Sequence, residues 1–570
     1  MSALSVYNTA SGRKERFESR VPGRVGMYSC GPTVYAPQHI GNMRPMVFAD
    51  LLKRTLIELG YEVEHVINIT DVGHLTDDAD AGEDKLEVAA RRTGERAEEI
   101  AARYTAQWQE DVARLNCLPP QVLCPATEHI PEQIALGVRL EEGGYTYALP
   151  DGIYFDTSRF ERYADFARLD LSAQEDGARI GSVEGKRNPA DFAIWKFAEE
   201  GIKRQQEWDS PWGRGFPGWH LECSAMSTRY LGNQFDIHTG GEDHIAVHHT
   251  NEIAQSECGY GVAPWVRYWM HNAFIDLSGE KMSKSKGHVL VVQDLVDQGI
   301  HPLGYRMFLL QAVYRMPQSF KFEAIRAAET SWRRLGAAFA ALSEADGTPD
   351  EAAQAEHRDA FQAAMCDDLN APRALAVVWD VVRSKTLADI DKRALLEVFD
   401  RGLGLGLDQA VEEDAASESD PRIDGLLADR QAARAAKDFA TSRYLRTVVR
   451  RLGGHPSVDA GDAEAIGHGL SRQAGVAIKP PLPWRGVVCE VLCDEGETWA
   501  RLTPDGHTRP VWLHLSADVY VDLQARCLEG RGFVGRTVLV SGHLRPDTPG
   551  PGDVAIRPWS EVGLPDVTFL

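Results

Sequence analysis

The chain lacks the features that would place it in a membrane or outside the cell. Its 570 residues contain no run of about 18 or more apolar residues, so we expect no membrane-spanning segment. The opening stretch MSALSVYNTASGRKERF has no apolar core of the kind that secretory signals carry, so we expect no such signal. Nine irregularly spaced cysteines do not indicate a disulfide framework. These absences favour a reducing cytoplasm, where cysteines are packed, reactive or metal-bound.

Positive charge is also scarce. Lysine and arginine number 61 against 84 aspartates and glutamates, which gives a net charge of −23 and argues against a polyanionic partner. A local basic surface would remove this objection, and residues 429–453 contain one. Its basic residues are Arg430, Arg434, Lys437, Arg443, Arg446, Arg450 and Arg451. We leave open whether this stretch contacts nucleic acid or is a solvated helix face.

The hydrophobic pattern predicts a parallel sheet. RVGMYSC at 24–30 is typical of a strand, 41–60 has apolar residues at helical spacing, and EVEHVINIT at 62–70 is typical of a second strand. A strand–helix–strand unit of this length favours an α/β fold in which ligands bind at the carboxyl ends of the strands. The same pattern returns between 216 and 275.

Changes in composition predict several domains, as expected for a chain too long for one core. Turn residues and scattered aromatics mark 119–215 as an insertion between two halves of the sheet domain, 1–118 and 216–325. Residues 326–460 are mostly helical in pattern. After a linker containing KPPLPW, short β-like runs separated by Gly, Pro and Asp predict a small β-rich domain over 475–570.

Two motifs suit phosphate groups. His39-Ile40-Gly41-Asn42 opens the predicted helix, where free backbone N–H groups and the positive dipole end bind anions. Gly41 lets a ligand approach the backbone, and His39 and Asn42 can donate to phosphate oxygens. In GEKMSKSKGH at 279–288, Lys281 and Lys284 can neutralise a departing polyphosphate. Each motif alone also fits a plain helix start or a solvated basic loop, but together they resemble the ATP-binding signature pair of class I aminoacyl-tRNA synthetases.

A third group of residues suits zinc. Cys30 ends the first predicted strand, GWHLECSAM contains Cys223, and AVHHTNEIAQ contains His248 and Glu252 at i and i+4 on one helix face. His249 has no acidic partner at that spacing, which favours His248 as the ligand. Two thiolates, one imidazole and one carboxylate form a zinc-binding set. Taken singly, each residue also fits a core or surface position, and spacing alone does not detect a site made from three distant segments.

These motifs together resemble the cysteinyl-tRNA synthetase family over residues 1–460. The resemblance implies that Cys30, Cys223, His248 and Glu252 hold one zinc ion at the floor of the amino-acid pocket. It further implies ATP with Mg²⁺, L-cysteine and tRNA(Cys) as substrates, and a helical anticodon-binding domain within 326–460. A zinc-based test for the thiolate suits an enzyme that must reject serine, because size alone discriminates poorly between small side chains.

The resemblance also implies roles for individual residues. Thr70, Trp219 and His220 would line the amino-acid pocket, and Asp243 would contact the adenosine. His39 and Asn42 would hold the phosphates of ATP, and Lys281 and Lys284 would stabilise the departing pyrophosphate. His244 is a further candidate in the pocket wall. We expect a cytoplasmic monomer with no membrane partner.

The sequence departs from the family at several points. Asn42 stands where many members have histidine, the metal helix reads HHTNE rather than HHENE, and the acidic loop 73–85 is longer than in many members. Residues 461–570 match nothing that we can place in the family. Two alternatives therefore stay open at this point: a mycothiol-pathway ligase that joins cysteine to an amino-sugar, and a non-catalytic RNA-binding paralogue.

Overall fold

The structure is a computed structural model. It describes residues 3–73, 84–168, 185–198, 204–276 and 290–410, and beyond them the backbone of strands between 484 and 569. The chain forms two compact units, Met1–Ala416 and Ser417–Leu570, which are described separately below.

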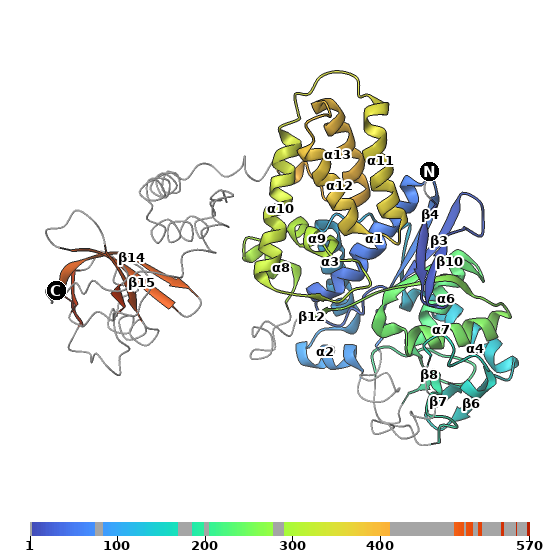
Figure 1. The fold of residues 1–570 in the computed structure, drawn as a ribbon. Helices are drawn as coiled ribbons and strands as arrows, with labels where there is room; N and C mark the ends of the chain where they lie inside the picture. Colours follow the sequence, from blue (N-terminus) through green and yellow to red (C-terminus); the bar gives the residue numbers. More distant parts are fainter. Residues whose placement is uncertain are drawn as a thin grey trace. The chain divides into compact units, whose positions relative to one another are not determined.

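A five-stranded parallel sheet forms the centre of the first unit (Figure 1). The strand order is β11-β10-β3-β4-β5, and every neighbouring pair is parallel. The bounds are β3 Arg24–Ser29, β4 Glu62–Ile69, β5 Val122–Pro125, β10 Phe235–Gly241 and β11 Val266–Asn272. The winding direction reverses between β3 and β10, which makes the carboxyl ends of these two strands the position where α/β sheets bind ligands.

The connecting helices match the sequence pattern. Helix α1 (Met43–Glu58) joins β3 to β4, and α7 (His248–Tyr260) joins β10 to β11. Helix α6 (Trp219–Leu231) leads into β10, and α2 (Lys85–Thr93) and α3 (Ala97–Arg114) follow β4. The predicted strand–helix–strand unit and the α/β fold class are confirmed.

The predicted insertion contains a separate antiparallel sheet of order β6-β7-β8-β9. Its strands are β6 Thr146–Leu149, β7 Gly152–Phe155, β8 Phe192–Phe197 and β9 Gly215–Pro217, and helix α4 (Ile130–Glu142) precedes them. One part of the range 119–215 differs from the prediction: β5 pairs with β4 and belongs to the main sheet. Its four residues, VLCP, stand close to Pro119 and Pro120, so turn residues concealed the strand. The chain also carries an amino-terminal hairpin, β1 (Ser5–Asn8) and β2 (Arg13–Arg16).

Helices dominate the rest of the first unit. The short strands β12 (Ile275–Asp276) and β13 (Gln318–Ser319) form a parallel pair, and α8 Val292–Asp297 and α9 Pro302–Leu310 lie between them in the chain. The helices after β13 are α10 Phe322–Ala340, α11 Glu351–Cys366, α12 Ala371–Arg383 and α13 Asp389–Leu403. The basic stretch 429–453 lies outside the described residues. Across the described part of the chain, no helix has the length and apolar character needed to cross a membrane.

The second unit contains a six-stranded sheet of order β18-β16-β15-β14-β17-β19. Its strands are β14 Trp484–Asp494, β15 Glu497–Pro504, β16 Val511–Leu515, β17 Thr537–Val540, β18 Val554–Ala555 and β19 Val567–Phe569. The β-like runs singled out in the sequence coincide with β14 to β17.

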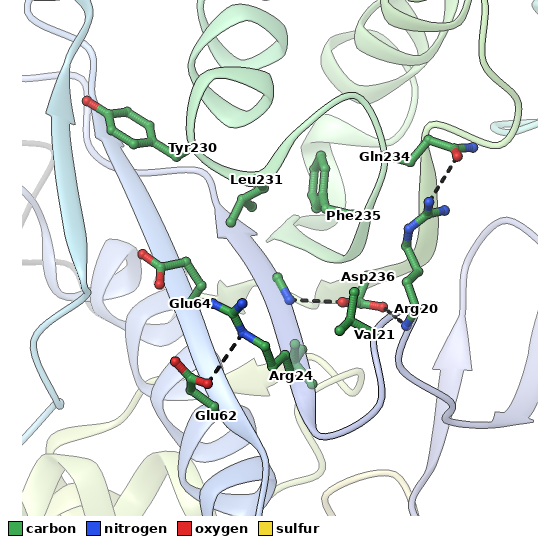
Figure 2. A pocket seen from close by; sticks show the side chains of 12 residues that line it. Arg20, Val21, Arg24, Glu62, Glu64, Tyr230, Leu231, Gln234, Phe235 and Asp236 are labelled. Carbon is green, nitrogen blue, oxygen red and sulfur yellow. Dashed lines mark hydrogen bonds and ion pairs between the residues drawn. The ribbon is translucent and has the colours of Figure 1, made fainter.

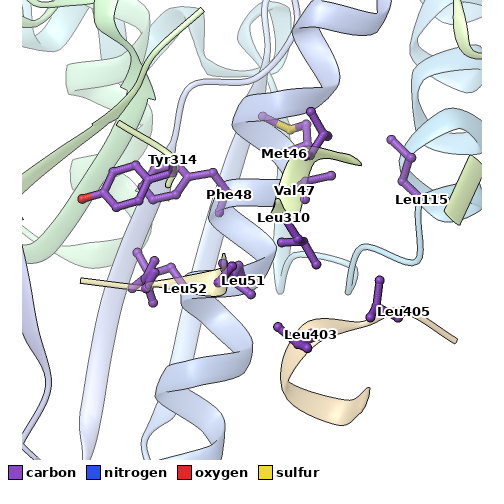
Figure 3. Close-up of a cluster of buried hydrophobic side chains, with 14 of the residues drawn as sticks. Met46, Val47, Phe48, Leu51, Leu52, Leu115, Leu310, Tyr314, Leu403 and Leu405 are labelled. Atoms are coloured by element: carbon purple, nitrogen blue, oxygen red, sulfur yellow. The ribbon is translucent and has the colours of Figure 1, made fainter. Parts of the chain in front are cut away.

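Helix α1 is buried on nearly all sides. Figure 3 shows its side chains Met46, Val47, Phe48, Leu51 and Leu52 within one apolar cluster. The same cluster takes in Leu310 of α9 and Leu403 of α13. The helix that begins beside the HIGN motif is therefore packed between the parallel sheet and the helical part of the unit.

A buried group of charges fixes the same helix. Asp50 on α1 accepts from Arg54 Nε at 2.8 Å, from Arg306 Nη2 and from Leu118 N. Arg306 donates from Nε to Leu403 O at 2.8 Å, at the carboxyl end of α13. Burial opposes ionisation of Asp50, but Arg306 and Arg54 hold its pKa below the ordinary range. The charge group thus joins α1, α9 and α13.

We expect Arg306→Met to lower the free energy of unfolding by about 3 kcal/mol or more, because Asp50 would keep a buried charge with one partner fewer. Denaturant unfolding followed by tryptophan fluorescence measures the loss. Arg401→Gln is the control, since Arg401 pairs with Glu58 on the surface and its loss should cost less than about 1 kcal/mol. Equal losses in the two variants would contradict the role given to Arg306.

Candidate metal and adenylate site

Cys30 lies directly after β3, at the carboxyl edge of the parallel sheet. Its backbone N donates to Thr239 O of β10 at 3.1 Å, so the ladder between the two strands continues to this residue. The thiol is buried and contacts the thiol of Cys223, which lies in the second turn of α6. The structure therefore joins two cysteines that stand almost 200 residues apart, as expected from the motifs.

His248 and Glu252 complete the cluster from the first two turns of α7. His248 Nε2 lies 2.7 Å from Glu252 Oε1 and 3.5 Å from Cys223 Sγ. All four side chains are buried. The i, i+4 spacing brings the imidazole and carboxylate to one helix face, as the sequence predicted.

Neighbouring imidazoles orient the two helix residues. His238 Nε2 donates to Glu252 Oε2 at 2.8 Å, and His220 Nδ1 lies 2.9 Å from His248 Nδ1. Burial would raise the Glu252 pKa, but His238 and His248 lower it well below its usual range. Burial would likewise lower the His248 pKa, but the Glu252 carboxylate raises it to about 10. With Nδ1 facing His220, Nε2 of His248 is the atom directed at Cys223 and Glu252.

A second histidine also reaches the cluster. Ligand atoms of Cys30, His248, His249 and Glu252 all lie within 4.8 Å of one another. His249 Nε2 is 3.3 Å from Cys30 Sγ, and its Nδ1 is 2.7 Å from His271 Nε2. Sequence spacing gave His249 no acidic partner, and it gave no sign of His238 or His271, which reach the site from β10 and β11.

The donor set fits zinc. Two ligands on one tetrahedral zinc, one sulfur and one nitrogen, lie about 3.5 Å apart, because Zn–S and Zn–N bonds are about 2.3 and 2.0 Å long. Cys223 Sγ and His248 Nε2 have that separation, 3.5 Å. Glu252 Oε1 is buried and lies 2.7 Å from His248 Nε2 without a well-directed hydrogen bond, so this carboxylate oxygen fits a cation held beside the imidazole. The Cys30–His249 contact makes His249 an alternative imidazole donor.

The HIGN motif starts α1 as predicted, but through a tighter turn. Residues Ile40–Asn42 form a 3₁₀ turn, and the α-helix begins at Met43. His39 and Asn42 are exposed, and neither side chain caps the helix. Ile40 N donates to Leu290 O and Asn42 N to His39 O, so the N–H of Gly41 is the group in this turn that faces no backbone acceptor among the described contacts. Although His39 keeps exposed surface, protein atoms that surround part of its ring disfavour the charged form and lower its pKa.

Lys281 and Lys284 lie outside the described residues, but both flanks of their segment are described. Before it, Phe274 N donates to Glu242 Oε1 at 2.9 Å, next to Asp243. After it, Leu290 O accepts from Ile40 N in the HIGN motif at 2.9 Å. The segment that carries KMSKS therefore leaves and rejoins the described structure beside the two segments predicted to bind ATP.

The residues predicted to bind the amino acid lie around the cluster. Thr70 follows β4, and its hydroxyl donates to Glu222 Oε2. The ring of Trp219 lies 4.6 Å from that of His248, measured between centroids, at the edge of the cluster. His220 instead lies behind His248, where it contacts Nδ1, the ring nitrogen that faces away from Cys223 and Glu252. Asp243 is exposed in the 3₁₀ turn Glu242–His244 that follows β10.

A cavity at the opposite edge of the sheet contains none of these residues. It measures about 210 Å³ and lies at the amino ends of β3, β4 and β10 (Figure 2). Asp236 accepts there from Arg20 N at 2.6 Å and Gly26 N at 2.9 Å, and Arg24 pairs with Glu62. Its polar groups thus contact one another and the backbone, which indicates a structural role.

Comparison with known proteins identifies the family. The model described as "tRNA synthetases class I (C) catalytic domain" matches residues 16–330, and "DALR domain" matches 360–390. The chain is 48% identical over 452 residues to "Cysteine--tRNA ligase 1" of Burkholderia lata, covering 79% of this chain and 94% of that protein. The chain belongs to the cysteine--tRNA ligase family. The family expected from HIGN, KMSKS and the four zinc-binding candidates is thereby confirmed.

Two further comparisons give a second relative and a solved structure with a similar fold. It is 46% identical over 488 residues to "Cysteine--tRNA ligase" of Novosphingobium aromaticivorans, with 81% of this chain and 96% of that protein covered. Among solved structures, LeuRS of a ternary complex from Agrobacterium radiobacter has a TM-score of 0.50 at 12% identity, covering 69% of this chain and 85% of that chain. The latter likeness supports the fold alone.

The two adjacent histidines provide a test of the metal ligands. We expect His248→Gln to lose the bound zinc, because Nε2 of His248 faces both Cys223 and Glu252, whereas His249→Gln should retain about one ion per chain. Metal analysis of the purified variants measures both. Loss of zinc from His249→Gln alone would instead assign the imidazole ligand to His249.

Proposed function

We propose that the protein is a cysteine--tRNA ligase, which activates L-cysteine with ATP and transfers it to tRNA(Cys). The observation that carries this proposal is the identity of 40–48% to cysteine--tRNA ligases that the chain covers almost completely. The buried Cys30, Cys223, His248 and Glu252 supply the chemistry that selection of a thiol requires. Neither an amino-sugar ligase nor a non-catalytic paralogue is supported by these relatives.

Selection of cysteine rests on the four buried residues. Cys30, Cys223, His248 and Glu252 would hold the zinc, which when bound takes up the substrate thiol as thiolate and gives serine a poorer ligand site. His238 keeps the Glu252 carboxylate oriented by its hydrogen bond. Trp219 covers His248 and limits the room for a larger side chain.

Activation requires no protein nucleophile. The carboxylate of cysteine attacks the α-phosphorus of ATP and forms cysteinyl-adenylate. The bond between the α-phosphorus and the oxygen that bridges to the β-phosphate breaks, and pyrophosphate leaves; Mg²⁺ would accompany these phosphates. The start of α1 at His39, Gly41 and Asn42 binds phosphate oxygens, and Asp243 contacts the adenosine. Catalysis by positioning and charge stabilisation is sufficient, because the carboxylate is itself the nucleophile.

The transfer step involves the helices at the end of the first unit. The DALR match at 360–390 lies on α11 to α13, in the range predicted to bind the anticodon. The 2′-hydroxyl of the terminal adenosine of tRNA(Cys) then attacks the carbonyl carbon of cysteinyl-adenylate, the bond from this carbon to the phosphate oxygen breaks, and AMP leaves. We further propose that the enzyme works in the cytoplasm as a monomer. The β-rich domain predicted over 475–570 is given no role in this scheme.

We expect Lys284→Ala to slow cysteine-dependent ATP–pyrophosphate exchange by about 100-fold or more, since one lost charge-stabilising donor commonly costs that much. Lys385→Ala is the matched control, because Lys385 is exposed on the helical part of the unit. Exchange near the wild-type rate in Lys284→Ala would contradict the proposal that Lys284 stabilises the departing pyrophosphate.

The proposed function is tested by exchange and charging on protein of known metal content. We expect cysteine-dependent exchange, about one zinc per chain, and charging of purified tRNA(Cys). Exchange without charging would point to another acceptor, for which an amino-sugar is the first candidate. Absence of both exchange and zinc would contradict the assignment.

A further inference from the structure

A chain of buried hydrogen bonds connects the two cysteine-bearing segments. Gly31 N donates to Asn68 Oδ1 at 2.8 Å, Asn68 Nδ2 donates to Thr70 Oγ1 at 3.0 Å, and Thr70 Oγ1 donates to Glu222 Oε2 at 3.1 Å. Glu222 has no exposed surface and Thr70 is 3% exposed. The chain thus links the ends of β3 and β4 to the first turns of α6.

Both ends of this chain are neighbours of the thiols. Gly31 follows Cys30, and Glu222 precedes Cys223. In L-cysteine only the β- and α-carbons separate the sulfur from the α-ammonium group. Thr70 N donates to Pro32 O at 3.0 Å, two residues after Cys30. We therefore infer that a cysteine whose sulfur lies at Cys30 and Cys223 holds its ammonium group near Thr70.

The direction of every hydrogen bond in the chain is fixed. Gly31 N can only donate, so the Asn68 oxygen faces it and the Asn68 amide nitrogen faces Thr70. A hydroxyl has one proton and two lone pairs. Since Asn68 uses one lone pair of Thr70, the proton goes to Glu222. The lone pair of Thr70 that remains can only accept a hydrogen bond.

We propose that Glu222 is a positioning residue that makes the Thr70 hydroxyl an obligatory acceptor for the α-ammonium group of cysteine. An ammonium group only donates, so the pocket favours the free amino acid over thiols that lack this group. The inference rests on the proposed function and adds a second recognition element to the thiol test.

Packing alone does not explain why an acidic residue, Glu222, is buried at this position. A carboxylate without exposed surface costs desolvation, and an apolar side chain would fill the space more cheaply. The first turn of α6 eases the presence of an acidic group, because free N–H groups lie there. The helix start stabilises the Glu222 carboxylate without any bond to Thr70. The bond to Thr70 has a separate effect, because it directs the hydroxyl proton away from the substrate.

The experiment compares two ligands in Glu222→Gln. L-cysteine and 3-mercaptopropionate, which lacks the amino group, compete in the exchange assay of the full-length, zinc-loaded enzyme. In the variant the amide can donate to Thr70, so the hydroxyl proton can turn towards the ammonium group. We expect the preference for L-cysteine to fall by about tenfold or more, the loss typical of a hydrogen bond to a charged group. Zinc content and the KM for ATP should not change.

Further variants keep the test independent of folding defects. Thr70→Val should lose the same preference and Thr70→Ser should retain it, while adding Glu222→Gln to Thr70→Val should cause no further loss. Glu329→Gln is the matched control, because Glu329 is buried on α10 and accepts from His301 N, far along the chain from the pocket.

Two results would overturn the inference. An unchanged preference in Glu222→Gln with intact zinc would show that the hydroxyl needs no positioning by this residue. Equal weakening of both ligands would reveal a general structural effect. If the wild-type enzyme shows no cysteine-dependent exchange at all, the proposed function fails first and the inference fails with it.

Discussion

The buried contact between Asp50 and Arg306 sets the position of helix α1, and the proposed adenylate site depends on that position. Arg306 extends from α9 to the last carbonyl groups of α13, so one guanidinium joins three elements. Because α1 starts at the HIGN motif, a shift of this helix would move the turn that we propose binds phosphate relative to Cys30. The apolar cluster in Figure 3 buries the side chains of the helix, and the charge pair fixes the position of the helix along its axis.

The candidate metal site is assembled differently, from polar groups whose burial is costly unless they are paired or bind a ligand. Two thiols, several imidazoles and a carboxylate lie together with little exposure. Burial keeps the pKa of His249 and His271 well below the ordinary value, so these rings favour the neutral form that metal and thiol chemistry requires. Burial of these polar groups lowers the free energy of unfolding, and burial of the large surrounding apolar core compensates for that loss.

The sequence predicted the parts of the fold that have strong periodicity. Helix α1 and strands β3 and β4 lie within two residues of the expected bounds, and the HHTNE helix begins at His248, four residues later than the pattern suggested. Strand β5 was missed because four residues near prolines resemble a turn. The four zinc-binding candidates meet in space, but only a family resemblance could join them, since no local pattern links Cys30 to Cys223. His238, His271 and Glu222 carried no signal, because a buried polar residue within an apolar strand or helix looks ordinary until its partners are known.

The pairing of β3 with β10 has a consequence for synthesis of the chain. Strand β10 is translated more than 200 residues after β3, so the nascent chain exposes one edge of β3 for all that time. The ladder closes only once β10 has left the ribosome, and α7 with His248 and Glu252 follows directly. The four proposed zinc ligands therefore come together only after α7 has been made. Until then the incomplete sheet exposes an unpaired strand edge, which makes a folding intermediate prone to aggregation.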